Sequence, residues 1–376
     1  MSGMKIRVCW IIPTLEEGGA EKQLCLLAKG IDRSRFEPLI IALTRGGPRL
    51  VDLTNHGISV VEINKRGKLD PWAFVRLVQA IRVFAPQIVH TWLFAANSYG
   101  RLAAIRAKVP VIFAGERCVD PWKGTSHRMI DRFLAKHSDG VIANSPAIVD
   151  FYSGRGIARE KFHIISNGIE SPNFAAISRE EAATRMGVDP NRLLIGAIGR
   201  LWLQKGHKDM IWAAEMLRVL HETTSLVIIG DGPERQRLEH YCDQVRAAKE
   251  IRFIGHRSDA AQLLPHFDIF WNASLYEGQS NAILEAMQAS VPVVASDIGG
   301  NRDLIQHQVT GMLFPASDVG SLMKNTSRLI ESVELRMQLA ENAKHQIETH
   351  FSLTQMIEGH EKIYQEFFDQ IGPRID

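Results

Sequence analysis

The sequence predicts an α/β protein built from two doubly wound domains. Three observations support this prediction. Apolar, β-rich runs alternate with helix-forming stretches along the whole chain, the runs fall into two sets of six, and a loose segment separates the two sets. The 376 residues are enough for two cores, since a domain commonly takes about 100 to 200 residues. We therefore expect two domains with six strands each.

The expected strands are short apolar runs. In the first domain they are residues 6–12, 37–43, 59–63, 88–90, 111–114 and 140–144. In the second domain they are residues 193–198, 225–229, 251–254, 269–272, 292–296 and 311–314. The boundary is expected at residue 170, before the loose segment 171–178, so the domains comprise residues 1–170 and 171–354. The apolar residues of 351–368 recur at helical spacing and predict a long amphipathic helix, expected to pack across the domain junction.

The composition is that of an ordinary globular protein, with 45% hydrophobic and 23% charged residues. The apolar run at the N-terminus is too short for a signal peptide, and no stretch approaches the roughly 18 apolar residues of a membrane span. The four cysteines follow no disulfide or metal-ligand spacing. We therefore expect a cytoplasmic protein.

The small net charge of +2 hides an asymmetry between the two halves. Residues 1–170 contain 24 Lys and Arg against 15 Asp and Glu, and residues 171–376 contain 20 against 27, which gives charges of +9 and −7. A basic first half is suited to an anionic membrane face or to a phosphate-bearing acceptor. The alternative is that the charge serves only solubility.

Two glutamates, Glu277 and Glu285, flank an expected turn from a buried strand into a helix. The turn comprises residues 278–281, with Ser280 or Asn281 as the N-cap. The first amides of a helix lack intrahelical partners, so this turn is suited to an anion such as a diphosphate. A carboxylate one turn into the helix, as Glu285 is, can accept two hydrogen bonds from a vicinal diol. Two solvated charges are the alternative, because such spacings often arise by chance.

Two cations, Arg200 and Lys205, follow the expected strand 193–198. Ligands of open α/β sheets bind at the carboxyl ends of the strands, so both are candidates for a ligand site. An Arg grips phosphate with two donors and a Lys adds a point charge, and together they can stabilise a leaving diphosphate without a metal. Taken alone, the segment also fits two ordinary surface cations.

Other strand ends supply weaker candidates. Glycines before an expected helix allow close backbone approach to a phosphate, and a strand end near Arg257 is suited to reading a base through its backbone. Gly230 and Gly232 do not complete the spacing of a nicotinamide dinucleotide site. The remaining candidates at expected strand or turn ends are Gly18, Gly19, His90, Glu116, Arg117, Asn144 and Ser145.

The glycine turn at residues 18–21, the segments 165–169, 199–206 and 230–233, and the glutamate pair with residues 292–300 together resemble the family 4 glycosyltransferases. The matches occur in the family's order and cover almost the whole chain. The resemblance implies a GT-B fold, in which two Rossmann-like domains face a cleft and a last helix, here 355–376, packs back on the first domain. It also implies that residues 171–354 bind the sugar nucleotide and residues 1–170 the acceptor.

The same resemblance implies roles for single residues. Arg200 and Lys205 would bind the diphosphate, Glu285 the ribose, and Glu277 the transferred sugar. The backbone of Gly278, Gln279, Ser280 and Asn281 would also hold the sugar, and Gly19 would approach the diphosphate. His90 resembles a histidine near the family's reaction centre, but Trp92 stands where a second histidine often follows.

We therefore expect a retaining, metal-independent glycosyltransferase without a cofactor, which moves a hexose or N-acetylhexosamine from a UDP-sugar to a glycan or lipid-linked acceptor. Contact with a membrane through the basic domain is expected, and nucleic acid is not an expected partner. A nucleotide-sugar epimerase of the same fold is an open alternative. A two-lobed sugar-binding protein is a weaker one, because such receptors are normally exported.

Overall fold

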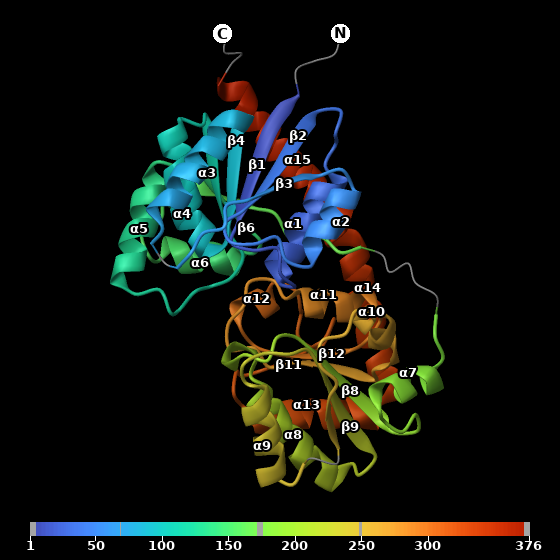
Figure 1. Cartoon of the computed structure of the whole chain (residues 1–376). Coiled ribbons are helices and arrows are strands. Elements are labelled where there is room, and N and C mark those ends of the chain that lie inside the picture. Colours follow the sequence, from blue (N-terminus) through green and yellow to red (C-terminus); the bar gives the residue numbers. More distant parts are fainter. Residues whose placement is uncertain (1–4, 68, 171–175, 248–249, 372–376) are drawn as a thin grey trace. The chain divides into compact units, whose positions relative to one another are not determined.

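The computed structural model describes residues 5–67, 69–170, 176–247 and 250–371, and it comprises two compact units (Figure 1). Unit 1 contains Met1–Gly168 and Leu353–Asp376, and unit 2 contains Ile169–Ser352. Residue 171, where the second domain was expected to begin, and residues 372–376 of the expected last helix lie outside the described residues. Each unit contains one sheet of parallel strands between helices, so the predicted fold class is confirmed.

The sheet of unit 1 has seven strands in the order β3-β2-β1-β4-β5-β6-β7. The strands are β1 Ile6–Ile12, β2 Phe36–Ala42, β3 Ser59–Glu62, β4 Ile88–Trp92, β5 Val111–Glu116, β6 Gly140–Ala143 and β7 Phe162–Ile164. The helices are α1 Gly19–Gly30, α2 Arg49–Asn55, α3 Pro71–Phe84, α4 Leu93–Ala107, α5 Thr125–Lys136, α6 Pro146–Ser153 and α15 Leu353–Ile371. Helices α1 and α15 pack on one face of the sheet and α3 and α4 on the other.

Unit 1 therefore has one strand more than the six expected. Strand β7 is only three residues long and pairs with β6 at the edge of the sheet. None of its residues is fully buried. Because so short a run lacks both length and an apolar pattern, the sequence gives no signal that separates it from a loop.

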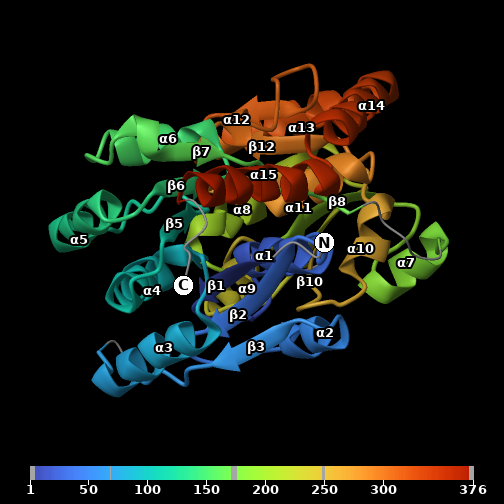
Figure 2. The same ribbon diagram turned by 90° about the horizontal axis from the view of Figure 1, so that it is seen from above.

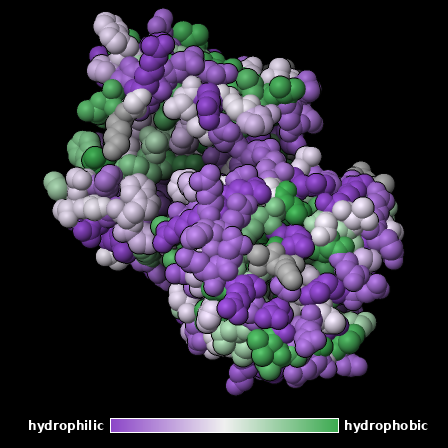
Figure 3. Space-filling view, turned by 60° about the horizontal axis from the view of Figure 1, so that its bottom comes forward, coloured by the Kyte–Doolittle hydropathy of each residue, from purple (hydrophilic) through white to green (hydrophobic). Residues whose placement is uncertain are grey.

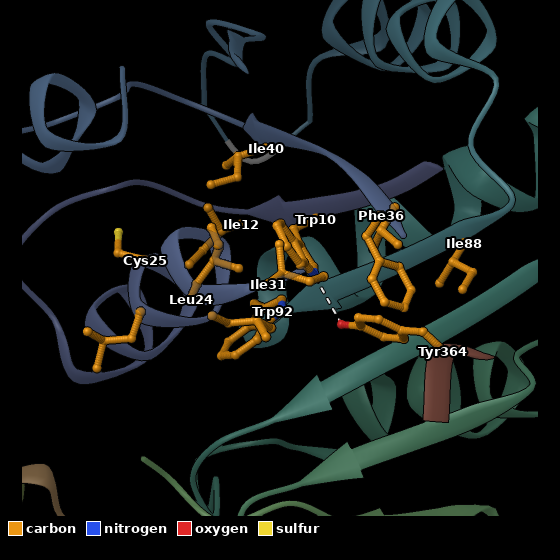
Figure 4. Close-up of a cluster of buried hydrophobic side chains, with 14 of the residues drawn as sticks. Trp10, Ile12, Leu24, Cys25, Ile31, Phe36, Ile40, Ile88, Trp92 and Tyr364 are labelled. Atoms are coloured by element: carbon orange, nitrogen blue, oxygen red, sulfur yellow. Dashed lines mark hydrogen bonds between the residues drawn. The ribbon is translucent and has the colours of Figure 1, made fainter. Parts of the chain in front are cut away.

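The last helix, α15, completes the core of unit 1. Trp10 lies in the middle of β1 with a fully buried side chain, and its Nε1 donates a hydrogen bond to the Tyr364 hydroxyl at 2.9 Å (Figure 4). Phe36 packs edge-on against the Tyr364 ring, with ring centres 6.3 Å apart. Seen from above, α15 runs beside α1 (Figure 2). The expectation that the chain returns to the first domain is confirmed.

The sheet of unit 2 has six strands in the order β10-β9-β8-β11-β12-β13. The strands are β8 Leu193–Ile198, β9 Thr224–Ile229, β10 Ile251–Phe253, β11 Ile269–Asn272, β12 Val293–Ser296 and β13 Met312–Phe314. The helices are α7 Arg179–Met186, α8 His207–Leu220, α9 Arg235–Gln244, α10 Ala260–Leu263, α11 Asn281–Gln288, α12 Gly299–Arg302, α13 Val319–Glu331 and α14 Val333–His350. Separate apolar clusters cover the two faces of this sheet.

The strand order of each sheet reverses at one point. In unit 1 the chain moves outward from β1 in one direction and then continues from β4 in the other, and in unit 2 the same change occurs between β8 and β11. At such a point the loops after two neighbouring strands diverge and leave room for a ligand at their carboxyl ends. The sheets therefore single out the loops after β1, β4, β8 and β11.

The surface in Figure 3 is mostly hydrophilic, and its hydrophobic side chains form small separate groups. Within the described ranges, no helix has the length and apolarity that crossing a membrane requires.

Candidate functional site

The carboxyl ends of β8 and β11 bring Lys205 and Glu277 into contact. After β8 the chain passes Arg200 and makes one short turn, Leu203–Lys205, before α8 begins. Lys205 Nζ forms an ion pair with Glu277 Oε1, and Ser274 Oγ donates to the same oxygen at 2.9 Å. Glu277 is only 9% exposed, so solvent screens this pair weakly. The ion pair therefore lies at the point where the strand order reverses.

Buried polar side chains hold the loop that carries Glu277. Asn272, the last residue of β11, donates from Nδ2 to Ser280 Oγ at 3.2 Å and accepts from the Ser274 amide at 3.2 Å. Ser296, the last residue of β12, donates to the Ser274 carbonyl at 2.5 Å, and Asn301 Nδ2 donates to the Ser296 carbonyl at 2.9 Å. The loop is thus fixed from two neighbouring strand ends, by contacts that no sequence pattern predicts.

Two glycines allow this close arrangement. Gly206 has φ of +65°, and a Cβ atom there would overlap the Ala273 carbonyl. A Cβ atom at Gly300, in α12, would overlap the Gly278 carbonyl, so only glycine lets α12 lie against the turn after Glu277.

The turn after Glu277 leads directly into α11. Ser280 is the N-cap residue, one of the two expected, although its side chain makes no capping hydrogen bond. Gly278, Gln279 and Ser280 are buried, and Asn281 is the first helical residue. Glu285 lies one turn into α11 and is half-buried. The positive end of the α11 dipole, with Lys205 on a neighbouring loop, gives this edge of unit 2 the character of an anion site.

The other two cations predicted for unit 2 have different surroundings. Arg200 is exposed, and its guanidinium carbon is 5.1 Å from the centre of the Trp202 ring. Arg257 is held by Asp259 through two hydrogen bonds of 2.7 Å each. These bonds hold the pKa of Asp259 below its usual range. The Arg257 side chain is thus paired with Asp259 inside the protein. The sequence predicted that the backbone of this segment reads the base, and that prediction stays open.

In unit 1, Gly18 and Gly19 lie where the loop after β1 leads into α1. Gly18 is the N-cap of this 12-residue helix and Gly19 is its first residue. A Cβ atom at Gly18 would overlap the Glu21 carboxylate in its present position, so a larger residue there would displace the end of that side chain. The two glycines therefore lie at the carboxyl end of β1, at the reversal point of this sheet.

His90 lies in the middle of β4 and not at its tip. The strand continues to Trp92, so the expected end of this strand was wrong. The side chain is completely buried, and its Nδ1 is 2.8 Å from the Tyr364 hydroxyl. Burial lowers the pKa of His90 well below its ordinary value, so the ring is neutral at pH 7. Trp92, two residues later, occupies the strand end.

Glu116 and Arg117 point to opposite faces of the sheet of unit 1, because they follow one another at the end of β5. Arg117 is buried beside Trp92, with its guanidinium carbon 4.6 Å from the ring centre, and it donates to Asn167 Oδ1. Asn144 Nδ2 donates to the same oxygen at 3.2 Å. Ser145 is the N-cap of α6 and accepts a long hydrogen bond of 3.4 Å from the Ile148 amide.

On the other face, Glu116 belongs to a buried group of charges. Lys123 Nζ lies 3.5 Å from Glu116 Oε1, 3.2 Å from Asp120 Oδ2 and 3.1 Å from Asp131 Oδ2. Desolvation raises the pKa of Glu116 to about 7. No sequence pattern marks Lys123, because it lies in a loop and its partners come from the end of β5, from the same loop and from α5.

The described parts of the chain contain no group of three His, Cys, Asp or Glu side chains arranged to hold a metal ion. All four cysteines are free.

Family models match both halves of the chain. Residues 17–171 match the model described as Glycosyltransferase Family 4, and residues 178–346 match the model described as Glycosyl transferases group 1. Together the two models span most of the sequence.

Curated relatives include two transferases with different donors. The Escherichia coli UDP-Gal:alpha-D-GlcNAc-diphosphoundecaprenol alpha-1,3-galactosyltransferase is 26% identical over 314 residues, which are 78% of this chain and 79% of that protein. The GDP-mannose-dependent alpha-mannosyltransferase of Mycobacterium tuberculosis is 30% identical over 262 residues, 65% of this chain and 64% of that protein.

Solved structures with the same fold include HepE from Anabaena in complex with UDP-glucose, with a TM-score of 0.86 and 23% identity over 96% of this chain and 100% of that one. Sucrose-phosphate synthase from Thermosynechococcus elongatus has a TM-score of 0.84 and 15% identity, covering 97% of this chain and 100% of the other.

Proposed function

We propose that this chain, which belongs to the family 4 glycosyltransferases, moves a hexose or N-acetylhexosamine from a UDP-sugar to a glycan or lipid-linked acceptor. It is a transferase of the GT-B fold that uses a nucleotide sugar. The proposed transfer retains the configuration of the sugar. The observation that carries the proposal is the Lys205–Glu277 ion pair beside the start of α11. A cation for the diphosphate and a carboxylate for sugar hydroxyls are what this donor requires.

The proposed donor site uses residues of unit 2 in separate roles. Lys205 and Arg200 bind the diphosphate, the α11 amides add to its stabilisation, and Glu277 accepts hydrogen bonds from the sugar. Glu285 accepts hydrogen bonds from the ribose, for which its half-buried position one turn into α11 is suitable. Uracil as the base is supported by the donor named for the E. coli relative and by the UDP-glucose complex of HepE, while the mycobacterial relative makes GDP the competing choice.

The proposed reaction needs neither a metal nor a protein base. The bond between the anomeric carbon and the diphosphate oxygen breaks, and its electron pair leaves with the diphosphate. The acceptor hydroxyl attacks the same face of the sugar, and its proton passes to the departing phosphate oxygen. Lys205 and the helix amides lower the barrier because they stabilise the negative charge that develops on the diphosphate. An epimerase, which the sequence left open, finds no support in the relatives.

The test is release of the nucleoside diphosphate by the purified full chain from a panel of UDP-, GDP- and ADP-sugars, with a diphosphate-linked lipid acceptor added. Wild type should act with UDP-sugars, and Lys205→Ala should lower turnover about 100-fold or more, as loss of one charge-stabilising donor does elsewhere. Glu285→Ala should also abolish transfer, mainly through donor affinity. Lys208→Ala, an exposed lysine on α8, is the matched control and should keep wild-type turnover. Near-normal turnover in Lys205→Ala or Glu285→Ala would overturn the residue roles.

The proposed place of action is the cytoplasmic face of a membrane, and α5 supports this. Met129, Ile130 and Phe133 are 65%, 45% and 55% exposed on this helix, and Trp122 precedes it at 51%. The same surface carries Arg128, Arg132 and Lys136, while the single acid of α5, Asp131, is buried in ion pairs. Exposed apolar side chains among cations suit the interface of an anionic membrane.

Cosedimentation with vesicles tests the membrane contact. Vesicles containing about one third anionic phosphatidylglycerol should bind wild type, whereas neutral phosphatidylcholine vesicles should not, because the cations of α5 supply part of the attraction. The double variant Met129→Ser/Phe133→Ser should lose binding about tenfold or more. Met337→Ser, on α14 of unit 2 and 67% exposed, controls for the loss of one exposed methionine. Equal binding of the double variant and wild type would contradict the contact.

A further inference from the structure

Arg117 is a buried guanidinium with no counter-charge among the residues that the structure describes. Its side chain is 7% exposed, and one of its nitrogens donates to Asn167 Oδ1. Within the residues that the structure describes, Nε and Nη1 have no hydrogen-bond partner, and no carboxylate lies within ion-pair distance of this side chain. Arg101, the other buried arginine of unit 1, differs because it pairs with Asp131 at 3.3 Å. A buried ion without a partner costs several kcal/mol, so this position is unfavourable unless something else supplies the charge.

The neighbours of Arg117 are polar atoms that also lack partners. The Trp92 ring lies under the guanidinium, and its Nε1 is buried without an acceptor in the described part of the chain. Asn144 uses Nδ2 for Asn167, and its Oδ1 is likewise unpaired among the described atoms. Native interiors satisfy nearly all buried polar groups, so several unsatisfied ones in one place indicate a bound group.

These residues share one edge of the sheet of unit 1. Trp92 is the last residue of β4, Arg117 the first after β5, and Asn144 the first after β6. Helix α6 begins two residues after Asn144, with Ser145 as its N-cap, and adds the positive end of its dipole. The three strands are adjacent, so their carboxyl ends form one continuous wall, which is where open α/β sheets bind ligands.

The charge of this wall calls for an anion. Burial lowers the pKa of Arg117 to about 9, so the guanidinium stays positive at neutral pH. The nearby His90 and His360 are neutral, because burial lowers the pKa of both, that of His360 to about 3. Arg117 Nε and Nη1 and Trp92 Nε1 therefore offer donors around one positive charge, with no carboxylate to compete for them.

We propose that Arg117, with Trp92, forms an anion subsite that binds a phosphate group of the acceptor. The guanidinium fork matches two phosphate oxygens, and the indole N–H supplies a third donor. The assignment to the acceptor rests on the proposed function, in which Lys205 of unit 2 serves the donor diphosphate. Nε and Nη1 are buried, so binding requires the side chains around them to move apart.

Binding of inorganic pyrophosphate tests the subsite without relying on transfer. In the full chain with Arg200→Ala and Lys205→Ala, which remove both proposed donor cations, titration calorimetry should detect pyrophosphate binding, and adding Arg117→Gln should weaken that binding tenfold or more. Arg117→Lys should fall between the two, since it keeps the charge without the fork. Trp92→Phe keeps the ring and removes the indole donor, so it should weaken binding by a few fold. Unchanged pyrophosphate affinity in Arg117→Gln would overturn the subsite.

Kinetics with paired acceptors then assigns the anion to the acceptor. For one sugar presented as an alkyl diphosphate and as an uncharged alkyl glycoside, Arg117→Gln should raise KM tenfold or more for the first and less than twofold for the second. UDP affinity of Arg117→Gln should stay within twofold of wild type, which reports a folded donor site. Equal KM changes for both acceptors would contradict the assignment. If wild type used neither acceptor, the proposed transfer would fail, while the pyrophosphate titration would still decide the subsite.

Discussion

Lys205 in unit 2 and Arg117 in unit 1 are two cations beside the carboxyl ends of parallel strands, and they differ in their partners. Lys205 is paired with Glu277, whereas Arg117 has no carboxylate partner among the described side chains. A paired cation is held in position before a ligand arrives, and the ligand has to compete with the internal carboxylate. An unpaired buried cation instead destabilises the empty protein and is relieved when an anion binds.

The loops around the two cations differ in how well hydrogen bonds hold them. In unit 2, Asn272, Ser274 and Ser296 form a chain of hydrogen bonds that fixes the loop of Glu277. In unit 1, Arg117 has Asn167 as its one hydrogen-bonded partner in the described residues, and irregular chain follows it. Unit 2 is therefore preorganised for its ligand, while unit 1 keeps unsatisfied polar groups for one. Three substitutions test this contrast.

Gly300→Ala should have the largest effect, because it attacks the preorganised loop directly. The new Cβ atom would overlap the Gly278 carbonyl, so the turn after Glu277 has to shift. We expect transfer to fall about 100-fold, as a misplacement of about 1 Å can cause, and the free energy of unfolding to fall by about 3 kcal/mol. Turnover and urea denaturation measure the two effects.

Gly320→Ala is the matched control for Gly300→Ala. Gly320 also lies in a helix, α13, but the nearest atom to its added Cβ would be Asp318 Oδ1 at 3.4 Å. Its turnover should equal that of wild type. If Gly300→Ala behaved like Gly320→Ala, the loop of Glu277 would not depend on this packing, and the contrast between the units would weaken.

Glu116→Gln tests whether buried charge is costly in unit 1. Desolvation raises the pKa of Glu116 to about 7 in the folded protein, from an ordinary value of 4.5. Between pH 4.5 and 7 the unfolded chain loses this proton and the folded chain keeps it, so the group lowers stability as pH rises through this window. Gln does not ionise, so the variant lacks this loss, and its stability relative to wild type should rise with pH.

The slope of that rise is at most about 1.4 kcal/mol per pH unit, and it should level off above pH 7. Urea denaturation at several pH values measures it. Glu160→Gln, which removes an exposed carboxylate from the same unit, provides the baseline. A difference between Glu116→Gln and wild type that stays constant or falls with pH would show that Lys123 compensates the buried charge fully.

The sequence predicted the fold well because its signals are local. Each of the twelve expected strands overlaps an observed one, since a buried parallel strand is a short apolar run bounded by turn residues. The signals that place Lys205 and Glu277 on loops after strands are local too. The resemblance to family 4 predicted that both residues bind the sugar nucleotide. Their direct ion pair, across 72 residues, needed the structure.

What the sequence did not reveal depends on contacts between distant segments. Strand β4 extends past His90 because β5 continues beside it, with Trp92 opposite Gly115. The Trp10–Tyr364 hydrogen bond spans 354 residues, and no local pattern marks either side chain as its donor or acceptor. The lack of a carboxylate near Arg117 is still harder to predict, because no residue in the sequence marks the absence of a partner among the described side chains.

Tyr364→Phe should have the smallest effect, and it separates the structural part of unit 1 from the binding part. The Tyr364 hydroxyl accepts from Trp10 Nε1 at 2.9 Å and lies 2.8 Å from His90 Nδ1, so its removal leaves two buried nitrogens unpaired. Unsatisfied buried groups cost about 1 to 3 kcal/mol each, and part of that cost is relieved by relaxation, so we expect a loss of about 2 kcal/mol in urea denaturation. Tyr241→Phe, at a partly exposed position of α9, should cost less than about 0.5 kcal/mol.

The effects of Tyr364→Phe on stability and on acceptor KM together show whether the core hydrogen bonds of unit 1 and the anion subsite are separate. Arg117 and Tyr364 both lie near His90 and His360, yet we assign Arg117 to the ligand and Tyr364 to the core. Tyr364→Phe should therefore lower stability and leave the KM of a diphosphate acceptor within twofold of wild type. A tenfold rise in that KM, measured where the variant remains folded, would mean that the hydrogen bonds of α15 and the anion subsite act as one unit.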